Sequence, residues 1–208
     1  PHQAEGQCDG SLDPLRWEPN EAFLTGTILH LWLSRIHWLD QGPLPNEEER
    51  RSTVVQFLGS DTRFHELDSL FKTILKSPAI RDLLSLRSYQ QQDGEGHSTA
   101  AQIRPELQNP RWEVYLEQPF VVRDQGVYTR GQFDRIVVLY DGNQIVGADI
   151  VDFKTDQVDP DAVDDRINFY RPQLELYQRA AAEWLHRPIS EISARLVFVR
   201  SGTVHRVC

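Results

Sequence analysis

The chain of 208 residues contains only two cysteines and no methionine. Cys8 and Cys208 lie near opposite ends of the sequence, and neither belongs to a C-x-x-C pair. Zinc sites and iron–sulfur clusters need several cysteines at short, regular spacing, so the sequence predicts neither. We expect two unpaired thiols of a cytoplasmic protein, while a disulfide between the two ends stays open.

Long hydrophobic runs are also missing. A membrane-spanning helix needs about 20 predominantly apolar residues. The longest candidate, residues 23–39, is interrupted by polar side chains, and the opening PHQAEGQCDG lacks the apolar segment of a secretory signal. We therefore expect no membrane partner.

Basic residues are scarce, since 22 Lys and Arg stand against 31 Asp and Glu, for a net charge of −9. A protein that binds nucleic acid on its own usually presents a basic surface. The composition therefore predicts weak DNA affinity for the isolated chain. Six basic residues nevertheless cluster along the sequence around the polar segment described below: Arg130, Arg135, Lys154, Arg166, Arg171 and Arg179.

The length and a hydrophobic content of 39% indicate a single compact domain over residues 1–208. Because the chain starts at Pro1 and has no Met, we expect it to be a segment of a longer polypeptide. Apolar spacing and helix breakers predict a helical N-terminal half, with helices at residues 21–40, 46–59, 62–76 and 78–87. The polar composition of residues 88–110 predicts a long loop that could border a functional site.

Strand patterns dominate the second half of the chain. They predict strands at residues 112–123, 127–139, 144–154, 194–199 and 203–207. A long helix is expected at residues 160–186, with Asp159 as its cap and Pro160 at its first position. These elements predict an α/β fold in which helices flank a central mixed sheet.

The most informative segment reads GQFDRIVV and then, after a turn, IVDFKT. It places Asp134 on one predicted strand, and Asp152 and Lys154 on the next. Because strand side chains alternate, Asp152 and Lys154 share one face of the sheet. Such groups are costly to bury unless they are paired or bind a metal. A plain salt bridge explains them, and so does metal-assisted cleavage of a phosphodiester.

The segment YRPQLELY follows in the predicted long helix. Tyr170, Gln173 and Tyr177 fall on one helix face. The two tyrosines are either ordinary core residues, or the face lines the same cleft as Asp152 and Lys154. In the latter case it offers an amide and a phenol to a phosphate or a base.

His30 ends the segment GTILH in the first predicted helix. A single histidine on an apolar helix is more often a core residue than a ligand. His30 is therefore a candidate only together with the residues above.

Five segments, GTILH, LEQPF, GQFDR, VDFKT and YRPQLELY, resemble in order and spacing the motifs of the RecB-type nuclease domain in the PD-(D/E)xK superfamily. The chain also looks like the C-terminal nuclease of AddA-type helicase-nucleases. The resemblance runs from about Gly26 to Tyr177 and implies a restriction-endonuclease-like core with a helical N-terminal part. The lack of a four-cysteine set disfavours the AddB-like relatives that carry an iron–sulfur cluster.

The resemblance implies a role for each matching residue. His30, Asp134 and Asp152 would hold a divalent metal, with the carbonyl group of Phe153 as a further ligand. Lys154 would act on the attacking water.

Three further positions match the family less directly. Glu117 in LEQPF matches a position that is often glutamate, and the nearby Glu113 leaves this assignment open. Gln173 and Tyr177 match the motif that lines the site, and Tyr170 precedes them on the same helix face.

Hard oxygen ligands suit Mg²⁺, and the imidazole of His30 makes Mn²⁺ a substitute. The expected function is a metal-dependent deoxyribonuclease, an exonuclease rather than a strict endonuclease. It would act in DNA repair and recombination on single-stranded DNA delivered by a linked helicase. The alternative is a catalytically silent module that binds DNA or protein and keeps a relic of the site, and no residue separates DNA from RNA as substrate.

Overall fold

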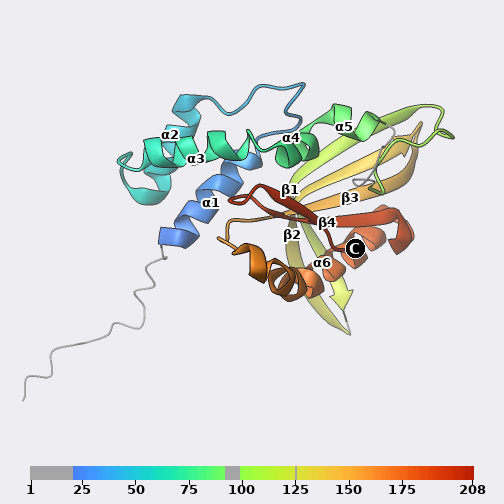
Figure 1. Cartoon of the computed structure of the whole chain (residues 1–208). Coiled ribbons are helices and arrows are strands. Elements are labelled where there is room, and N and C mark those ends of the chain that lie inside the picture. The colour runs from blue at the N-terminus through green and yellow to red at the C-terminus, as the bar shows by residue number, and fades with distance from the viewer. Residues whose placement is uncertain (1–20, 92–98, 125) are drawn as a thin grey trace, which may run out of the picture.

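The computed structural model describes residues 21–91, 99–124 and 126–208 (Figure 1). Five helices precede the sheet: α1 (Glu21–Leu33), α2 (Glu47–Leu58), α3 (Phe64–Ile74), α4 (Pro78–Leu84) and α5 (Leu86–Gln90). Three strands follow, β1 (Pro110–Asp124), β2 (Val127–Asp141) and β3 (Gln144–Lys154). The 3₁₀ turn η1 (Pro160–Ala162) leads into α6 (Val163–Leu185), and η2 (Ile189–Glu191) leads into β4 (Ile192–Phe198) and β5 (Thr203–Arg206).

The five strands form one sheet in the order β1-β2-β3-β4-β5. Strands β3 and β4 are parallel and are connected through α6, while the other neighbouring strands are antiparallel. This arrangement confirms the predicted α/β fold with a central mixed sheet. The pairing of β2 with β3 begins at Arg135, so the first part of β2 pairs only with β1 and the two form a projecting hairpin (Figure 1).

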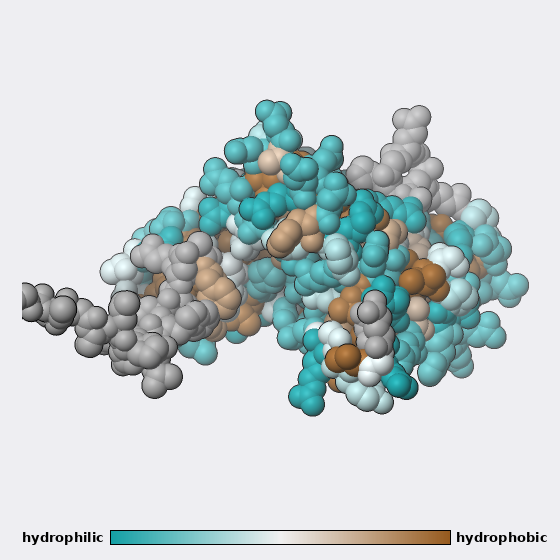
Figure 2. Space-filling model, turned by 90° about the horizontal axis from the view of Figure 1, so that it is seen from below, coloured by the Kyte–Doolittle hydropathy of each residue, from teal (hydrophilic) through white to brown (hydrophobic). Residues whose placement is uncertain are grey.

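Polar residues dominate the surface seen in Figure 2, where hydrophobic residues form small, separate groups. Several of the exposed large hydrophobic residues belong to the projecting hairpin, namely Val121, Val127 and Tyr128. In the described parts of the chain, no helix has the length and apolar character needed to cross a bilayer.

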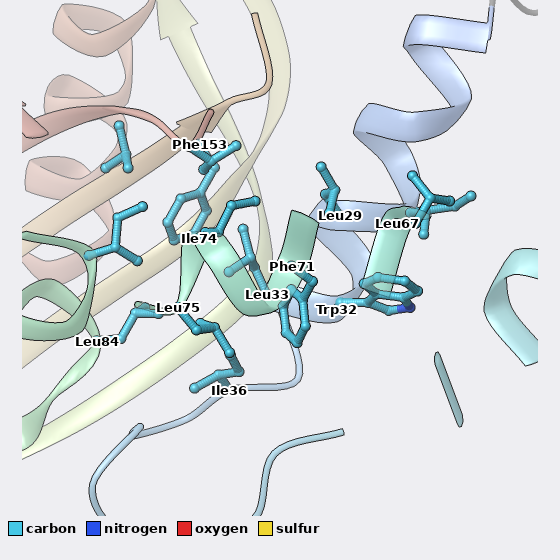
Figure 3. Packing of buried hydrophobic residues seen from close by; sticks show 14 of the residues in the cluster. Leu29, Trp32, Leu33, Ile36, Leu67, Phe71, Ile74, Leu75, Leu84 and Phe153 are labelled. Carbon is cyan, nitrogen blue, oxygen red and sulfur yellow. The ribbon is translucent and has the colours of Figure 1, made fainter. Parts of the chain in front are cut away.

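Helices cover both faces of the sheet. On one face, α1 to α4 pack around a hydrophobic core that includes Trp32 and Phe71 and that receives Val151 and Phe153 from β3 (Figure 3). On the other face, α6 packs through residues such as Leu174 against a second core that includes Ile150. Successive side chains of β3 therefore alternate between the two cores, as predicted.

A buried arginine fixes the segment that follows α1. Arg135 on β2 is 0% exposed, and its guanidinium donates to the carbonyl oxygens of Ile36 at 2.7 Å and His37 at 2.6 Å. The same guanidinium lies 5.0 Å from the ring centroid of Trp38. Burial lowers the pKa of Arg135 to about 10. Arg135, one of the six basic residues that cluster along the sequence, therefore ties the sheet to the helical layer.

Two predicted helices end earlier than expected. The first stops at Leu33 rather than near residue 40, because residues 34–42 turn to meet Arg135, and His37 therefore lies outside the helix. The helix predicted at residues 78–87 breaks at Ser85, and a new helix starts at Leu86. The carboxylate of Asp40 accepts hydrogen bonds from the backbone N–H groups of Leu86 and Arg87, at 2.9 and 3.0 Å, and so caps α5 from a distant part of the chain.

The predicted loop at residues 88–110 packs away from the end of β3 that carries Lys154. Residues 92–98 lie outside the described residues, and α5 extends to Gln90. The following residues cover the start of β3, where Ala101 accepts a hydrogen bond from the indole N–H of Trp112 at 2.7 Å. For the described part, the expectation that this loop borders the functional site is therefore wrong.

The predicted helix at residues 160–186 begins with the 3₁₀ turn η1, and α6 itself starts at Val163. Asp159 occupies the N-cap position of this turn and Pro160 its first position, as predicted, but the Asp159 side chain forms no capping hydrogen bond.

Beneath the segment at residues 99–101, β3 and β4 share a buried ion pair. The guanidinium of Arg195 contacts the carboxylate of Asp149, which also accepts hydrogen bonds from the hydroxyls of Tyr89 at 2.9 Å and Ser193 at 2.7 Å. These hydrogen bonds offset the cost of removing both charges from water. The ion pair therefore fastens α5 to the parallel strands.

We predict that Gly147→Ala destabilises the fold by about 1–3 kcal/mol, because a Cβ atom there would lie 1.9 Å from the backbone oxygen of Ala100. The matched control is Gly42→Ala, where the nearest atom would be 3.5 Å away. Urea unfolding measures both variants. Equal midpoints for the two would contradict the packing described.

Candidate active site

The candidate site lies where β2 and β3 run side by side, between α1 and α6. Asp134 sits on β2, immediately before the stretch that pairs with β3. Its Oδ2 atom accepts a hydrogen bond from the backbone N–H of Phe153 at 2.8 Å. This bond holds the Asp134 carboxylate against the end of β3.

Asp152 and Lys154 project from β3 on the face covered by α6, as the alternation predicts. The side chain of Asp152 is 2% exposed, and its Oδ2 atom lies 2.8 Å from Nζ of Lys154. The ammonium group of Lys154 also donates to Oε1 of Gln173 at 3.1 Å. Lys154 therefore links the strand carboxylate to the helix.

The helix α6 presents its three predicted residues together. The amide group of Gln173 donates to the hydroxyl of Tyr177 at 2.7 Å, while Nζ of Lys154 lies 4.6 Å from the ring centroid of Tyr170. The Tyr170 hydroxyl donates to the carboxylate of Asp156. Burial raises the pKa of Tyr177 to about 12, and burial followed by the hydrogen bond to Asp156 raises the pKa of Tyr170. Both phenols therefore stay protonated at neutral pH.

His30 reaches the site from α1, on the other side of the sheet. Its Nδ1 atom lies 3.5 Å from Oδ2 of Asp134, and its ring packs edge-on against Phe153 with centroids 6.3 Å apart. Burial lowers the pKa of His30, partly offset by the nearby negative charge of Asp152. His30 is therefore neutral at neutral pH, as a metal-binding imidazole must be.

Glu117 joins the site through an irregular turn of β1. It has a positive φ of 50°, and it interrupts the pairing in which Leu116 faces Arg135 and Gln118 faces Phe133. The side chain of Gln132 donates to the carbonyl oxygen of Glu117 at 2.8 Å and to Oε2 at 2.9 Å. Burial and the charge of Asp134 raise the pKa of Glu117.

Glu113 lies elsewhere. It faces Val138, further along β2, and its carboxylate accepts a hydrogen bond from the Tyr115 hydroxyl at 2.6 Å and pairs with Arg111. Of the two glutamates that the sequence leaves open, Glu117 is thus the one beside Asp134.

Burial dominates the electrostatics of the two aspartates. Removal from water raises the pKa of both carboxyl groups to about 6, against the opposing effects of the Phe153 N–H on Asp134 and of the Lys154 charge on Asp152. For Asp152, the negative charge of Asp134 adds to the rise. The positive charge near the two carboxylates therefore does not offset their removal from water.

A comparison with models of protein families identifies the superfamily of this chain. The family model described as the PD-(D/E)XK nuclease superfamily matches residues 10–206. This protein belongs to the PD-(D/E)XK nuclease superfamily. A search of curated proteins gave no match.

Nucleases of this superfamily act on DNA and generally use divalent metal ions such as Mg²⁺. Within residues 21–91, 99–124 and 126–208, no group of three or more His, Cys, Asp or Glu side chains is already arranged to hold a metal ion. The donors nevertheless suit a hard cation, since Asp134 and Asp152 supply carboxylate oxygens. Oδ2 of Asp152 is buried and accepts no well-aligned hydrogen bond, even though Lys154 is within ion-pairing distance. A cation could satisfy this oxygen.

A pocket of about 740 Å³ adjoins the site and shares His30 with it. Residues that the motif search did not select line this pocket, among them Thr155 from the loop after β3 and Arg200 from the turn after β4. The sequence carries no motif for these residues, and the parallel pairing of β3 with β4 brings them together, because the carboxyl ends of parallel strands meet at one edge of the sheet. The other arginines of the predicted basic cluster differ in position: Arg166 lines the pocket, whereas Arg171 donates to the carbonyl oxygen of Val207.

We predict that Asp134→Asn stabilises the metal-free nuclease at pH 7.5 by about 1–3 kcal/mol. The folded-state pKa of Asp134 is raised to about 6 from 3.8. The wild type therefore loses stability as the pH rises through about 6, whereas asparagine cannot ionise and can still accept the hydrogen bond from Phe153.

Urea unfolding in EDTA between pH 4 and 8 measures this difference, which should vanish near pH 4. The exposed residue Asp161 supplies a surface control, and Asp161→Asn should leave the urea midpoint at pH 7.5 unchanged. Equal stability of wild type and Asp134→Asn at pH 7.5 would refute the assigned charge state.

Proposed function

We propose that this protein is a divalent-metal-dependent deoxyribonuclease of the RecB type, active as an exonuclease on single-stranded DNA. The observation that carries the proposal is the buried Asp134–Asp152 pair beside Lys154. Two buried carboxylates with raised pKa values, contacted by the Phe153 N–H and the Lys154 ammonium, form a site that a divalent cation would stabilise. A simple salt bridge between Asp152 and Lys154 would not explain why a second carboxylate, that of Asp134, is buried beside them.

Asp134, Asp152 and His30 are the proposed metal ligands, together with the carbonyl group of Phe153. The bound metal supplies Lewis acidity towards the phosphoryl oxygen and makes water a stronger nucleophile near neutral pH. The Phe153 N–H holds the Asp134 carboxylate in place. The imidazole of His30 lies beside this carboxylate, and His30 is neutral, as a metal ligand must be. A site with one imidazole and two carboxylates accepts Mg²⁺ and suits Mn²⁺ as well.

Lys154 is the proposed catalytic cation. Hydrolysis adds the oxygen of water to phosphorus and breaks one P–O ester bond, while negative charge builds up on the phosphoryl oxygens. The ammonium group of Lys154 is compact and is oriented by Asp152 and the Gln173 amide, which favours a fixed position beside the water or the phosphate.

Glu117, Gln173, Tyr177 and Tyr170 complete the proposed site. Glu117 adds a third carboxyl group next to Asp134, where it can accept a proton or help to hold water. Gln173 aligns Lys154 and is itself held by Tyr177, while the ring of Tyr170 faces the ammonium group. We propose that these side chains of α6 contact the substrate as well as Lys154.

The biological setting is proposed from the sequence motifs and the charge. A net charge of −9 disfavours tight binding of the isolated chain to DNA. We therefore propose that residues 1–208 form a single nuclease domain of a longer helicase-nuclease. The helicase would deliver single strands during DNA repair and recombination in the cytoplasm.

The first test is cleavage of end-labelled single-stranded DNA in Mg²⁺ or Mn²⁺. We expect Asp152→Ala and Lys154→Ala each to reduce the rate at least about 100-fold, because each removes charge from the reacting centre. The matched surface controls are Asp161→Ala and Lys76→Ala, whose exposed side chains lie outside the site, and they should retain activity.

Cleavage that persists in both site variants would overturn the proposed mechanism. A folded wild type that cuts neither DNA nor RNA, alone or with a helicase, would favour the alternative of a silent binding module. Matched DNA and RNA oligonucleotides decide the sugar preference, and the sizes of the labelled products separate exonuclease from endonuclease action.

A further inference from the structure

The pocket of about 740 Å³ next to the candidate site is built from four parts of the chain. Phe23 and His30 belong to α1, Thr155 and Asp156 to the loop after β3, Arg166 to the beginning of α6, and Arg200 to the β4–β5 turn. A volume of this size lies within the range of about 300–1,000 Å³ that is typical of ligand pockets.

Close packing of α1 against the loop after β3 brings the pocket next to the candidate site. A Cβ atom at Gly26 would lie 2.7 Å from the Thr155 hydroxyl oxygen, so only glycine allows this approach without a shift. Four residues later, about one helical turn, His30 lines the pocket and also meets Asp134. A DNA strand in this pocket would therefore lie next to the carboxylates of the candidate site.

Two guanidinium groups make the lining suited to phosphate. Arg166 and Arg200 are exposed, and within the described residues neither forms an ion pair or a hydrogen bond. Asp156 is the acidic residue of the lining, and its carboxylate already accepts the hydrogen bond from Tyr170. Arginine binds phosphate oxygens through its planar fork of N–H donors.

Phe23 adds an aromatic surface at the same pocket, with 56% of its area exposed. Single-stranded DNA is typically bound by a groove in which basic side chains follow the phosphates and aromatic rings stack on bases. The combination of Arg166, Arg200 and Phe23 matches this chemistry.

We propose that this pocket holds the DNA strand beside the bond that is cut, with Arg166 and Arg200 each binding a backbone phosphate and Phe23 lying against a base. The inference rests on the proposed nuclease function, because it assigns the path of the substrate through the same site. It places strand binding on α1, α6 and the β4–β5 turn, outside the carboxylates and Lys154.

The test measures binding of a fluorescein-labelled dT12 oligonucleotide by anisotropy in EDTA, where no metal-dependent cleavage occurs. We expect Arg166→Ala and Arg200→Ala each to raise Kd about fivefold to tenfold, and each to reduce the slope of log Kd against log salt by about 0.7. Lysine at either position should restore most of the salt slope, because it keeps the charge.

The matched control is Arg87→Ala, which removes an exposed arginine of α5 that does not line the pocket. Its Kd and salt slope should equal those of the wild type. The inference is overturned if the two pocket variants behave like Arg87→Ala, or if the wild type shows no binding of dT12 at low salt.

Cleavage assays with Mg²⁺ or Mn²⁺ separate this inference from the proposed function. If both hold, the pocket variants cleave an oligonucleotide with a raised KM, whereas Arg87→Ala keeps the wild-type KM. Arginine-dependent binding without cleavage supports the pocket and counts against the nuclease. Cleavage with an unchanged KM in the double variant Arg166→Ala/Arg200→Ala supports the nuclease and refutes the pocket.

Discussion

The removal of the Asp134 and Asp152 carboxylates from water is the constraint on which the rest of the site depends. Adjacent strands set the two side chains close together, and burial makes their ionised forms costly. The fold offers limited compensation, through one backbone N–H for Asp134 and the ammonium of Lys154 for Asp152. The remaining deficit of positive charge explains why a protein with a net charge of −9 would favour a divalent cation at this place.

The fold holds this unfavourable arrangement because buried polar contacts fasten helices that precede the sheet in the sequence to its strands. Arg135 holds the segment after α1, and the Asp149–Arg195 pair joins the parallel strands and α5. Between these contacts, Val151 and Phe153 anchor β3 in the helical core. The strand that carries Asp152 and Lys154 is therefore supported on both sides, and the ends of β3 and β4 meet at the edge where the pocket opens.

Local sequence patterns were sufficient to predict the strands of the sheet and the set of polar residues near Asp134. The alternation in IVDFKT gave the strand at residues 144–154 with its bounds and the face shared by Asp152 and Lys154, and helical spacing gave the common face of Gln173 and Tyr177. Long-range contacts were not predictable in this way. The end of α1 depends on Arg135, about 100 positions later, and the start of α5 on Asp40. Arg200 has no motif of its own, since only the pairing of β3 with β4 brings it to the pocket.

The most direct test of the central claim is a calorimetric titration of the purified protein with Mn²⁺ at pH 7.5, alongside Asp134→Ala and Asp152→Ala. The account predicts saturable binding to the wild type and its loss in both variants, because each removes a carboxylate that the cation would neutralise. Circular dichroism spectra of both variants would establish that they remain folded. Mn²⁺ binding of equal affinity and stoichiometry in all three proteins would contradict the account, because the two buried carboxylates would then not be the metal site.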